Sequence, residues 1–172
     1  MYVSVLQEPR PLERRDDRSR FQSGNTEIDD WFHRFAWQNH RAGNARVFVT
    51  TQEPETLGFY ALSMGAVQRS TLPDALKPGQ RPEPCPVLLL ARLAVDQRAQ
   101  GRGIGAALLK DALLRAYKLS NEVGFAALLV HCANDQAREF YLSQSSHFVP
   151  CPGAENHLML PLRAMREFID AL

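Results

Sequence analysis

A glycine-rich segment just after a long apolar run constrains the fold of this chain more than any other feature. It reads Arg98-Ala-Gln-Gly-Arg-Gly-Ile-Gly-Ala106 and follows the apolar stretch 87–95. Glycines let successive backbone N–H groups converge without a Cβ clash, and a helix that begins beyond them adds positive charge at its N-terminus. The segment therefore predicts a strand, a turn and a helix, with a cradle for an anion such as a pyrophosphate.

The spacing of the glycines excludes two common phosphate loops. A dinucleotide-binding loop has G-x-G-x-x-G and a Walker loop has G-K-[ST], and this segment has neither. The glycines alone therefore leave open a helix start that binds no ligand.

Hydrophobic periodicity predicts further elements on both sides of this turn. A strand, a crossover helix and a second buried strand form a parallel pair, and the preceding hairpin is antiparallel, so we expect an α/β fold with a mixed sheet. The expected elements are a helix over 26–41 with Ile28, Trp31, Phe32, Phe35 and Ala36 on its apolar stripe, strands over 46–51 and 56–62, a proline-rich loop over 72–86, a strand over 87–95, a helix over 105–119, a strand over 125–130, a helix over 134–143, strands around Phe148 and over 157–162, and a terminal helix that carries Met165.

Length and composition bound the class of protein. The 172 residues predict a single domain over 1–172, and the net charge of +1 means that any basic surface for nucleic acid must be local. The longest apolar runs fall far below the ~20 residues of a membrane span, and residues 1–10 contain no basic leader, so we expect no membrane segment and a cytoplasmic protein. Cys85, Cys132 and Cys151 lack C-x-x-C spacing, which predicts three free thiols and no metal site.

The motif Arg98-x-x-Gly101-x-Gly103 on a strand-to-helix turn resembles the acetyl-CoA signature of the Gcn5-related N-acetyltransferase (GNAT) superfamily. The similarity runs from about residue 21 to 162, and one branch is especially similar: the toxins of toxin–antitoxin modules that acetylate aminoacyl-tRNA. The sequence departs from the superfamily at Ser146-His147-Phe148, where Gly-Phe is usual. The matching segments are Phe21-x-Ser-Gly24, Arg46-x-Phe48-Val49, Gly58-Phe-Tyr-Ala61-Leu62, Pro86-Val87, Ala91-Arg-Leu-Ala-Val-Asp96, Val130-His131 and Ala137-Arg-Glu-Phe140-Tyr141.

The resemblance implies a GNAT-type mixed central sheet flanked by helices, with splayed strands that form an acetyl-CoA slot. Pantetheine would pair with the backbone of the strand before the turn, and the Val95 N–H would hold the thioester oxygen as negative charge develops on it. Asn134 would bind pantetheine or simply cap its helix. The residues implied for the cofactor are Leu93, Ala94, Val95, Arg98, Gly101, Arg102, Gly103, Ile104, Gly105, Ala106 and Asn134.

Tyr141 is implied as the acid that protonates the departing CoA thiolate, since a phenol and a thiolate have comparable basicity. From the residues alone, an ordinary core aromatic beside Phe140 is the other reading. An α-amino group next to an ester is partly neutral at cellular pH, so no strong base is required. His131 is therefore left out of the catalytic set and, like His33 and His40, is expected to be structural.

A tRNA substrate requires local positive charge. Arg34 and Arg41 lie seven residues apart on the first expected helix, and Arg92 interrupts an apolar strand, where a charge is costly without a ligand or a partner such as Asp96. The resemblance further implies a ribbon-helix-helix antitoxin and a homodimer.

Two alternatives stay open at this stage. An enzyme of the same fold that acetylates a small amine would have a substrate pocket lined by acids, whereas a basic rim would favour tRNA. A CoA-sensing or RNA-binding module that has lost catalysis would bind its ligand without turnover, and the presence of Tyr141 argues against it.

Overall fold

The computed structural model describes residues 4–171, so the first three residues of the N-terminal segment and the last residue of the expected domain lie outside it. The chain divides into two compact units. Unit 1 contains the residues up to Leu62 together with Arg92–Ala112, and unit 2 contains Ser63–Ala91 and Leu113 onward. A single domain over 1–172 stays a prediction.

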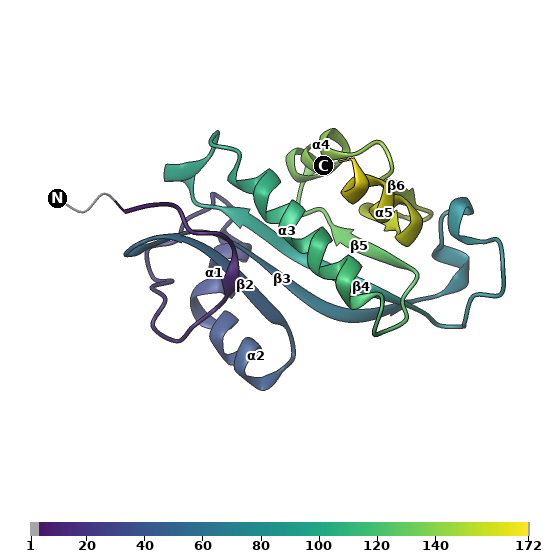
Figure 1. The fold of residues 1–172 in the computed structure, drawn as a ribbon, viewed down its shortest axis with the longest axis horizontal. Coiled ribbons are helices and arrows are strands. Elements are labelled where there is room, and N and C mark those ends of the chain that lie inside the picture. Colours follow the sequence, from purple (N-terminus) through teal and green to yellow (C-terminus); the bar gives the residue numbers. More distant parts are fainter. Residues whose placement is uncertain (1–3, 172) are drawn as a thin grey trace. The chain divides into compact units, whose positions relative to one another are not determined.

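Within residues 4–171 the chain forms seven strands and five α-helices, and Figure 1 shows the course of the chain. The strands are β1 (Arg10–Pro11), β2 (Arg46–Gln52), β3 (Glu55–Val67), β4 (Cys85–Val95), β5 (Ala127–His131), β6 (Val149–Cys151) and β7 (Ala154–Pro161), and the helices are α1 (Thr26–Arg34), α2 (Ala36–Ala42), α3 (Ile104–Leu119), α4 (Asp135–Gln144) and α5 (Leu162–Asp170). The strand order is β1-β2-β3-β4-β5-β7-β6. Only β4 and β5 form a parallel pair in the registers described, and β1–β2, β2–β3, β5–β7 and β6–β7 are antiparallel. The expected mixed-sheet α/β class is confirmed.

Unit 1 has a core of aromatic and aliphatic side chains where α1 and α2 pack on β2 and β3. Phe32 is fully buried, with its ring 4.1 Å from that of Phe59 in a stacked arrangement and 4.9 Å from that of Phe21. Trp31 and Trp37 are partly buried against the same core. The Asn25 side chain accepts from the N–H of Ile28 over 3.1 Å and so caps α1 as expected.

The helix predicted over 26–41 is wrong in one respect, because it is two helices that meet at Phe35. Phe35 has φ of −122° and ψ of −17° and ends α1 while it begins α2. Phe32 and Ala36 face the core and are fully buried, but Phe35 does not belong to this buried face and is 39% exposed. Its place on the apolar stripe is therefore corrected: the periodicity identifies the side of the helix but cannot detect the break.

Unit 2 is built on the parallel pair of β4 with β5. The proline-rich segment between β3 and β4 contains two short 3-10 turns, and Leu72 and Leu76 from these turns are buried in the core of the unit. All three cysteines are buried and free, as predicted.

The turn before β6 contains Ser146 and His147 at the place where Gly-Phe is usual. No residue other than glycine has positive φ within residues 4–171, so Ser146 and His147 turn without the left-handed region. The His147 N–H donates to the Ser145 Oγ over 3.1 Å instead. In the same described range, no helix combines the length and apolar character needed to cross a bilayer.

Candidate functional site

The glycine-rich turn leads from β4 into α3 and presents backbone donors. Gly101 and Gly103 have φ of +82° and +79°, a conformation that side chains with a Cβ rarely adopt. No heavy atom lies within 4 Å of a Cβ placed on either glycine, so backbone conformation and not space requires them. The N–H groups of residues 104–106 form the first turn of α3 and have no partner within the helix. The turn therefore has the form of the predicted anion cradle.

A close approach between β3 and α3 fixes where the cradle lies in unit 1. A Cβ placed on Gly58 would lie 2.9 Å from Leu108 Cδ1 and 3.2 Å from Ile104 Cγ2. A side chain at Gly58 would therefore push away the first turns of α3.

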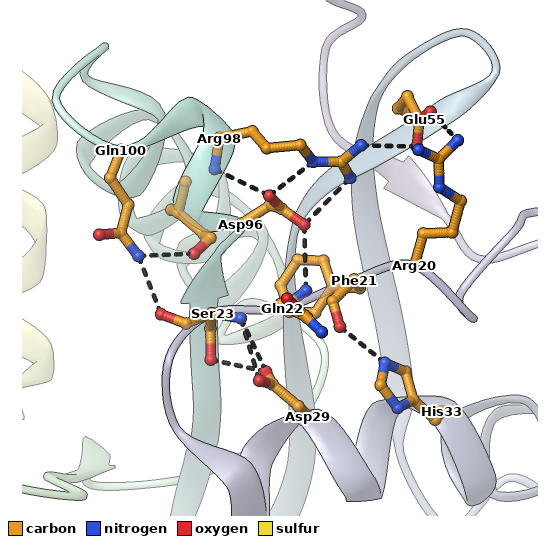
Figure 2. Close-up of polar contacts among 11 residues, drawn as sticks. Arg20, Phe21, Gln22, Ser23, Asp29, His33, Glu55, Asp96, Arg98 and Gln100 are labelled. Atoms are coloured by element: carbon orange, nitrogen blue, oxygen red, sulfur yellow. Dashed lines mark hydrogen bonds and ion pairs between the residues drawn. The ribbon is translucent and has the colours of Figure 1, made fainter.

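Asp96 is the buried anchor of the turn (Figure 2). Its carboxylate is 1% exposed and accepts from the N–H of Gln22 over 3.0 Å, from the N–H of Arg98 over 2.9 Å and from the Arg98 Nε over 2.8 Å. Burial alone would raise the pKa of Asp96, but the hydrogen bonds from Arg98 and Gln22 outweigh it and lower the pKa. The charged carboxylate therefore joins the turn to the segment that precedes α1.

Gln100 makes a second connection between the same two segments (Figure 2). Its Nε2 donates to the Val95 carbonyl over 3.0 Å and to the Ser23 carbonyl over 2.9 Å. Ser23 is itself held by Asp29 of α1, which accepts from the Ser23 Oγ over 2.6 Å. The end of β4 is thus fixed by contacts with residues more than 70 positions away.

The arginines of the turn differ in how far their charge is already satisfied. The Arg98 guanidinium contacts Asp96 and also Glu55, at 3.0 Å, and these acids raise its pKa. The N–H groups of Arg98 and Ala99 both donate to Asp96, so the open part of the cradle begins beyond them. Arg102 contacts Gln52 at 3.3 Å and makes no ion pair within residues 4–171. Of the two, Arg102 is the side chain that is free to meet a phosphate.

The backbone at the end of β4 contacts both neighbouring strands. The parallel ladder with β5 covers positions 88–90. The Asp96 N–H donates to the Leu57 carbonyl of β3 over 2.8 Å. The backbone of Leu93–Val95 lies between these two contacts, beyond the described ladder with β5. The pairing role expected for Leu93 and the oxygen-binding role expected for Val95 both fall in this stretch.

Arg92 lies over an aromatic ring and makes no ion pair within the described residues 4–171. Its guanidinium carbon is 4.2 Å from the centre of the Trp31 ring. Its expected alternative partner, Asp96, binds Arg98 instead. Burial lowers the pKa of Arg92, and the nearby Glu27 raises it by less.

The other two arginines expected to bind tRNA lie on α1 and α2. Arg34 is exposed, makes a 3.4 Å ion pair with Asp30 and lies 5.3 Å from the centre of the Phe35 ring. Arg41 is exposed in the last turn of α2. Both belong to unit 1, as does Arg92.

Tyr141 lies in α4 of unit 2 and is 3% exposed. Its ring contacts those of Phe140 and Phe148, at 5.3 Å and 5.7 Å between centres. Burial, with a smaller contribution from Cys132, raises its pKa well above the usual range. A buried tyrosine hydroxyl usually has a hydrogen-bond partner, but this one has none among residues 4–171. Packing therefore explains the ring, and the hydroxyl stays available to donate to a ligand.

Asn134 caps α4, because its Oδ1 accepts from the N–H of Ala137 over 2.8 Å. It also lines a cavity of about 430 Å³ in unit 2 together with Cys132 and Arg138. The cap is therefore observed, and a contact with pantetheine stays a prediction.

The histidines outside the catalytic set have structural partners. His33 contacts the Phe21 carbonyl at 2.7 Å, the His40 Nδ1 accepts from the N–H of Val47, and His131 contacts His157 at 3.0 Å. Within residues 4–171, no group of three or more His, Cys, Asp or Glu side chains is arranged to hold a metal ion.

Sequence reasoning did not identify two side chains that shape this site. The sequence indicates Asp96 only as a possible partner for Arg92, and Trp31 only as part of an apolar stripe. The short Asp96-x-Arg98 spacing is a signal for the first, since a carboxylate can cap the N–H two residues on. No sequence signal pairs Trp31 with a residue 61 positions away.

Comparison with known proteins agrees with the fold. A family model described as an acetyltransferase (GNAT) domain matches residues 43–144. A tRNA-acetylating toxin from Mycobacterium tuberculosis is 40% identical over 167 residues, which cover 97% of this chain and 99% of that protein.

Solved structures are similar over nearly the whole length. AtaT complexed with acetyl-methionyl-tRNAfMet has a TM-score of 0.84 at 28% identity, covering 95% of this chain and 98% of that one. A tyrosine-to-phenylalanine mutant of AtaT, bound to the C-terminus of the antitoxin AtaR and acetyl-CoA, has a TM-score of 0.79 at 26% identity, covering 96% and 99%. With a family model that matches more than half of its length and a fold that agrees, the chain belongs to the GNAT family of acetyltransferases.

Proposed function

We propose that this protein is a toxin that transfers an acetyl group from acetyl-CoA to the α-amino group of aminoacyl-tRNA and thereby blocks translation. The observation that carries the proposal is the 40% identity to a tRNA-acetylating toxin over 97% of the chain. A similarity of this extent includes the turn, β4 and α4 together, so it bears on the substrate as well as on the fold.

Acetyl-CoA fits the residues at the end of β4 and in the turn that follows. Its pyrophosphate would lie on the N–H groups from Gly101 to Ala106, where a left-handed turn meets a helix N-terminus. The Arg102 guanidinium adds a charge that no acid has neutralised within residues 4–171. Pantetheine would pair with the backbone of Leu93–Val95. Arg98 serves by holding the turn in place through Asp96.

The chemical step needs one oxygen-binding donor and one acid. The neutral amine attacks the thioester carbon, a C–N bond forms, and the Val95 N–H stabilises the negative charge on the oxygen. The C–S bond then breaks and the leaving thiolate takes the phenolic proton of Tyr141. The nitrogen releases its extra proton, which restores the phenol through water. Because burial raises the pKa of Tyr141, the phenol is protonated at neutral pH.

Local positive charge from Arg92, Arg34 and Arg41 would hold the tRNA. Arginine binds phosphate with its planar fork and stacks on bases. The relative AtaT has been solved with acetyl-methionyl-tRNAfMet, which supports this class of substrate.

The proposed partners are a ribbon-helix-helix antitoxin and a second copy of this chain. The AtaT complex with the C-terminus of AtaR supports a protein antitoxin. The cytoplasm is the proposed location, because charged tRNA and acetyl-CoA meet there.

A small amine is the competing substrate class, and one feature of unit 1 bears on it. A cavity of about 360 Å³ is lined by two acids, Asp29 and Asp30. Both carboxylates already have partners, since Asp29 accepts from Ser23 and Asp30 pairs with Arg34. The acids of this cavity therefore do not favour an amine as the substrate.

The test is acetyl transfer from radiolabelled acetyl-CoA to bulk charged tRNA, to uncharged tRNA and to a panel of polyamines and aminoglycosides. The proposal predicts label on charged tRNA alone. Label on small amines alone would contradict it, and binding of acetyl-CoA with no label on any acceptor would favour a module that senses CoA.

A further inference from the structure

Arg92 and Trp31 form a cation–π contact within unit 1. The guanidinium carbon lies 4.2 Å from the ring centre, which is close for a cation–π pair. Arg92 is half-buried, yet its guanidinium makes no hydrogen bond and no ion pair within residues 4–171. A buried charge is costly unless its donors are used. The N–H donors of the Arg92 guanidinium are therefore unused within the described residues.

Trp31 is positioned by its contact with the core of unit 1. Its ring lies parallel to that of Phe59, with 6.1 Å between centres and 16° between planes. Phe59 is itself fully buried and stacked on Phe32. Trp31 therefore joins the contact with Arg92 to the buried rings of Phe59 and Phe32.

The position of Arg92 along β4 relates it to the proposed reaction. Arg92 and Ala94 lie on the same face of the strand, and Ala94 packs in the core beneath α1. Val95, the proposed oxygen-binding residue, is three positions further on, or about 10 Å along a strand. An aminoacyl group is esterified to the terminal nucleotide of its tRNA, so a residue at this spacing is placed to meet that unpaired end.

We propose that Arg92, which lies over the Trp31 ring, is a stacking platform for an unpaired base at the acceptor end of aminoacyl-tRNA, with Trp31 as its positioning residue. Unpaired bases are recognised by stacking on arginine planes and aromatic rings. This inference rests on the proposed function and assigns a specific contact within it. The alternative is that Arg92 acts only as a positive charge, and the experiment distinguishes this role from stacking.

The experiment measures kcat, KM for aminoacyl-tRNA and KM for acetyl-CoA in variants that separate charge from stacking. Arg92→Lys keeps the charge and removes the plane, Trp31→Leu removes the support, and Trp31→Phe retains a ring. We expect Arg92→Lys and Trp31→Leu each to raise KM for aminoacyl-tRNA about tenfold, and Trp31→Phe to raise it less. KM for acetyl-CoA should stay within about twofold of the wild type. The double variant Trp31→Leu/Arg92→Lys should be no worse than the more severe single variant, because both lose the same platform.

Trp37→Leu is the matched control. Trp37 is also partly buried against the core of unit 1, but its ring stacks on His40 and has no arginine or lysine over it among the described residues. The Trp37→Leu variant should lower the melting temperature about as much as Trp31→Leu and leave KM for aminoacyl-tRNA unchanged. The inference is overturned if Trp31→Leu matches Trp37→Leu in KM, if Arg92→Lys behaves as the wild type, or if the two effects multiply in the double variant. A wild type that transfers no acetyl group to charged tRNA overturns the proposed function as well.

Discussion

At the scale of single residues, the hydroxyl of Tyr141 is the group on which the proposed chemistry depends most. Tyr141→Phe removes the proton donor and keeps the ring contacts with Phe140 and Phe148. We expect kcat to fall by about 10² or more, with both KM values within about twofold of the wild type. Steady-state kinetics with charged tRNA measure this.

Tyr117→Phe is the control for Tyr141→Phe, since it removes the hydroxyl of another tyrosine in unit 2. It should leave kcat unchanged. If Tyr141→Phe also keeps more than half of the wild-type kcat, Tyr141 is a packing residue and another group protonates the thiolate.

Asp96 couples the stability of unit 1 to pH. Burial opposes the charge of Asp96, but hydrogen bonds from Arg98 and Gln22 lower its pKa in the folded protein. The charged carboxylate therefore contributes its full stabilisation above the pKa of about 4 in the unfolded chain. This contribution is lost as the pH falls through the lower pKa of the folded protein. We expect Asp96→Asn to lower the free energy of unfolding by about 3 kcal/mol at pH 7. Urea denaturation from pH 7 down to about pH 3 should show the difference from wild type shrinking below about pH 4; a difference that is constant with pH would contradict this account.

At the scale of elements, the turn before α3 should affect the cofactor more than the fold. Gly103→Ala forces a residue with a Cβ into φ of +79°, which costs about 1 to 2 kcal/mol, and it should raise KM for acetyl-CoA about tenfold by displacing the N–H groups. Gly43→Ala is the matched control, because Gly43 has φ of +80° at the end of α2 and also has no neighbour within 4 Å of a Cβ. Both variants should lose similar stability. If Gly103→Ala and Gly43→Ala change KM for acetyl-CoA equally, the turn is not part of the cofactor site.

The elements that the sequence predicts best are those defined by local signals. The turn and α3 have glycine at the positive φ positions and a clear apolar stripe, so the expected helix start at 105 differs from the observed start by one residue. The break at Phe35 has no such signal, because the residues around it keep helical spacing across the junction. The burial of Leu72 and Leu76 from a proline-rich loop also depends on packing that a local pattern does not describe.

At the scale of the whole molecule, the sequence predicts the candidate site only where residues close in the chain create it. The backbone cradle is local and was predicted. The charge of Arg98 is used by Asp96 and by Glu55, and Glu55 is 43 positions away. Such distant pairs depend on tertiary packing, and this is why the sequence implies Arg98 and Arg102 alike for the cofactor and does not indicate that Arg98 already binds two acids.

Binding of tRNA by a chain with net charge +1 should depend on few arginines. Each phosphate contact that is lost should make the slope of log K against log salt concentration shallower by about 0.7 to 0.9. We therefore expect Arg34→Gln and Arg41→Gln each to reduce the slope by about that amount, measured by fluorescence anisotropy with labelled tRNA. Arg15→Gln is the control, because Arg15 is an exposed arginine that pairs with Glu13. If all three variants have the wild-type slope, Arg34 and Arg41 do not contact phosphate.

The most direct test of the central claim identifies the atom that receives the acetyl group. Charged tRNA is treated with this protein and acetyl-CoA, the aminoacyl ester is cleaved with base, and the released amino acid is analysed by mass spectrometry. The account predicts an amino acid that is one acetyl group heavier, with the group on its α-nitrogen. Unmodified amino acid from a reaction that has consumed acetyl-CoA would show that the acetyl group goes elsewhere and would contradict the account.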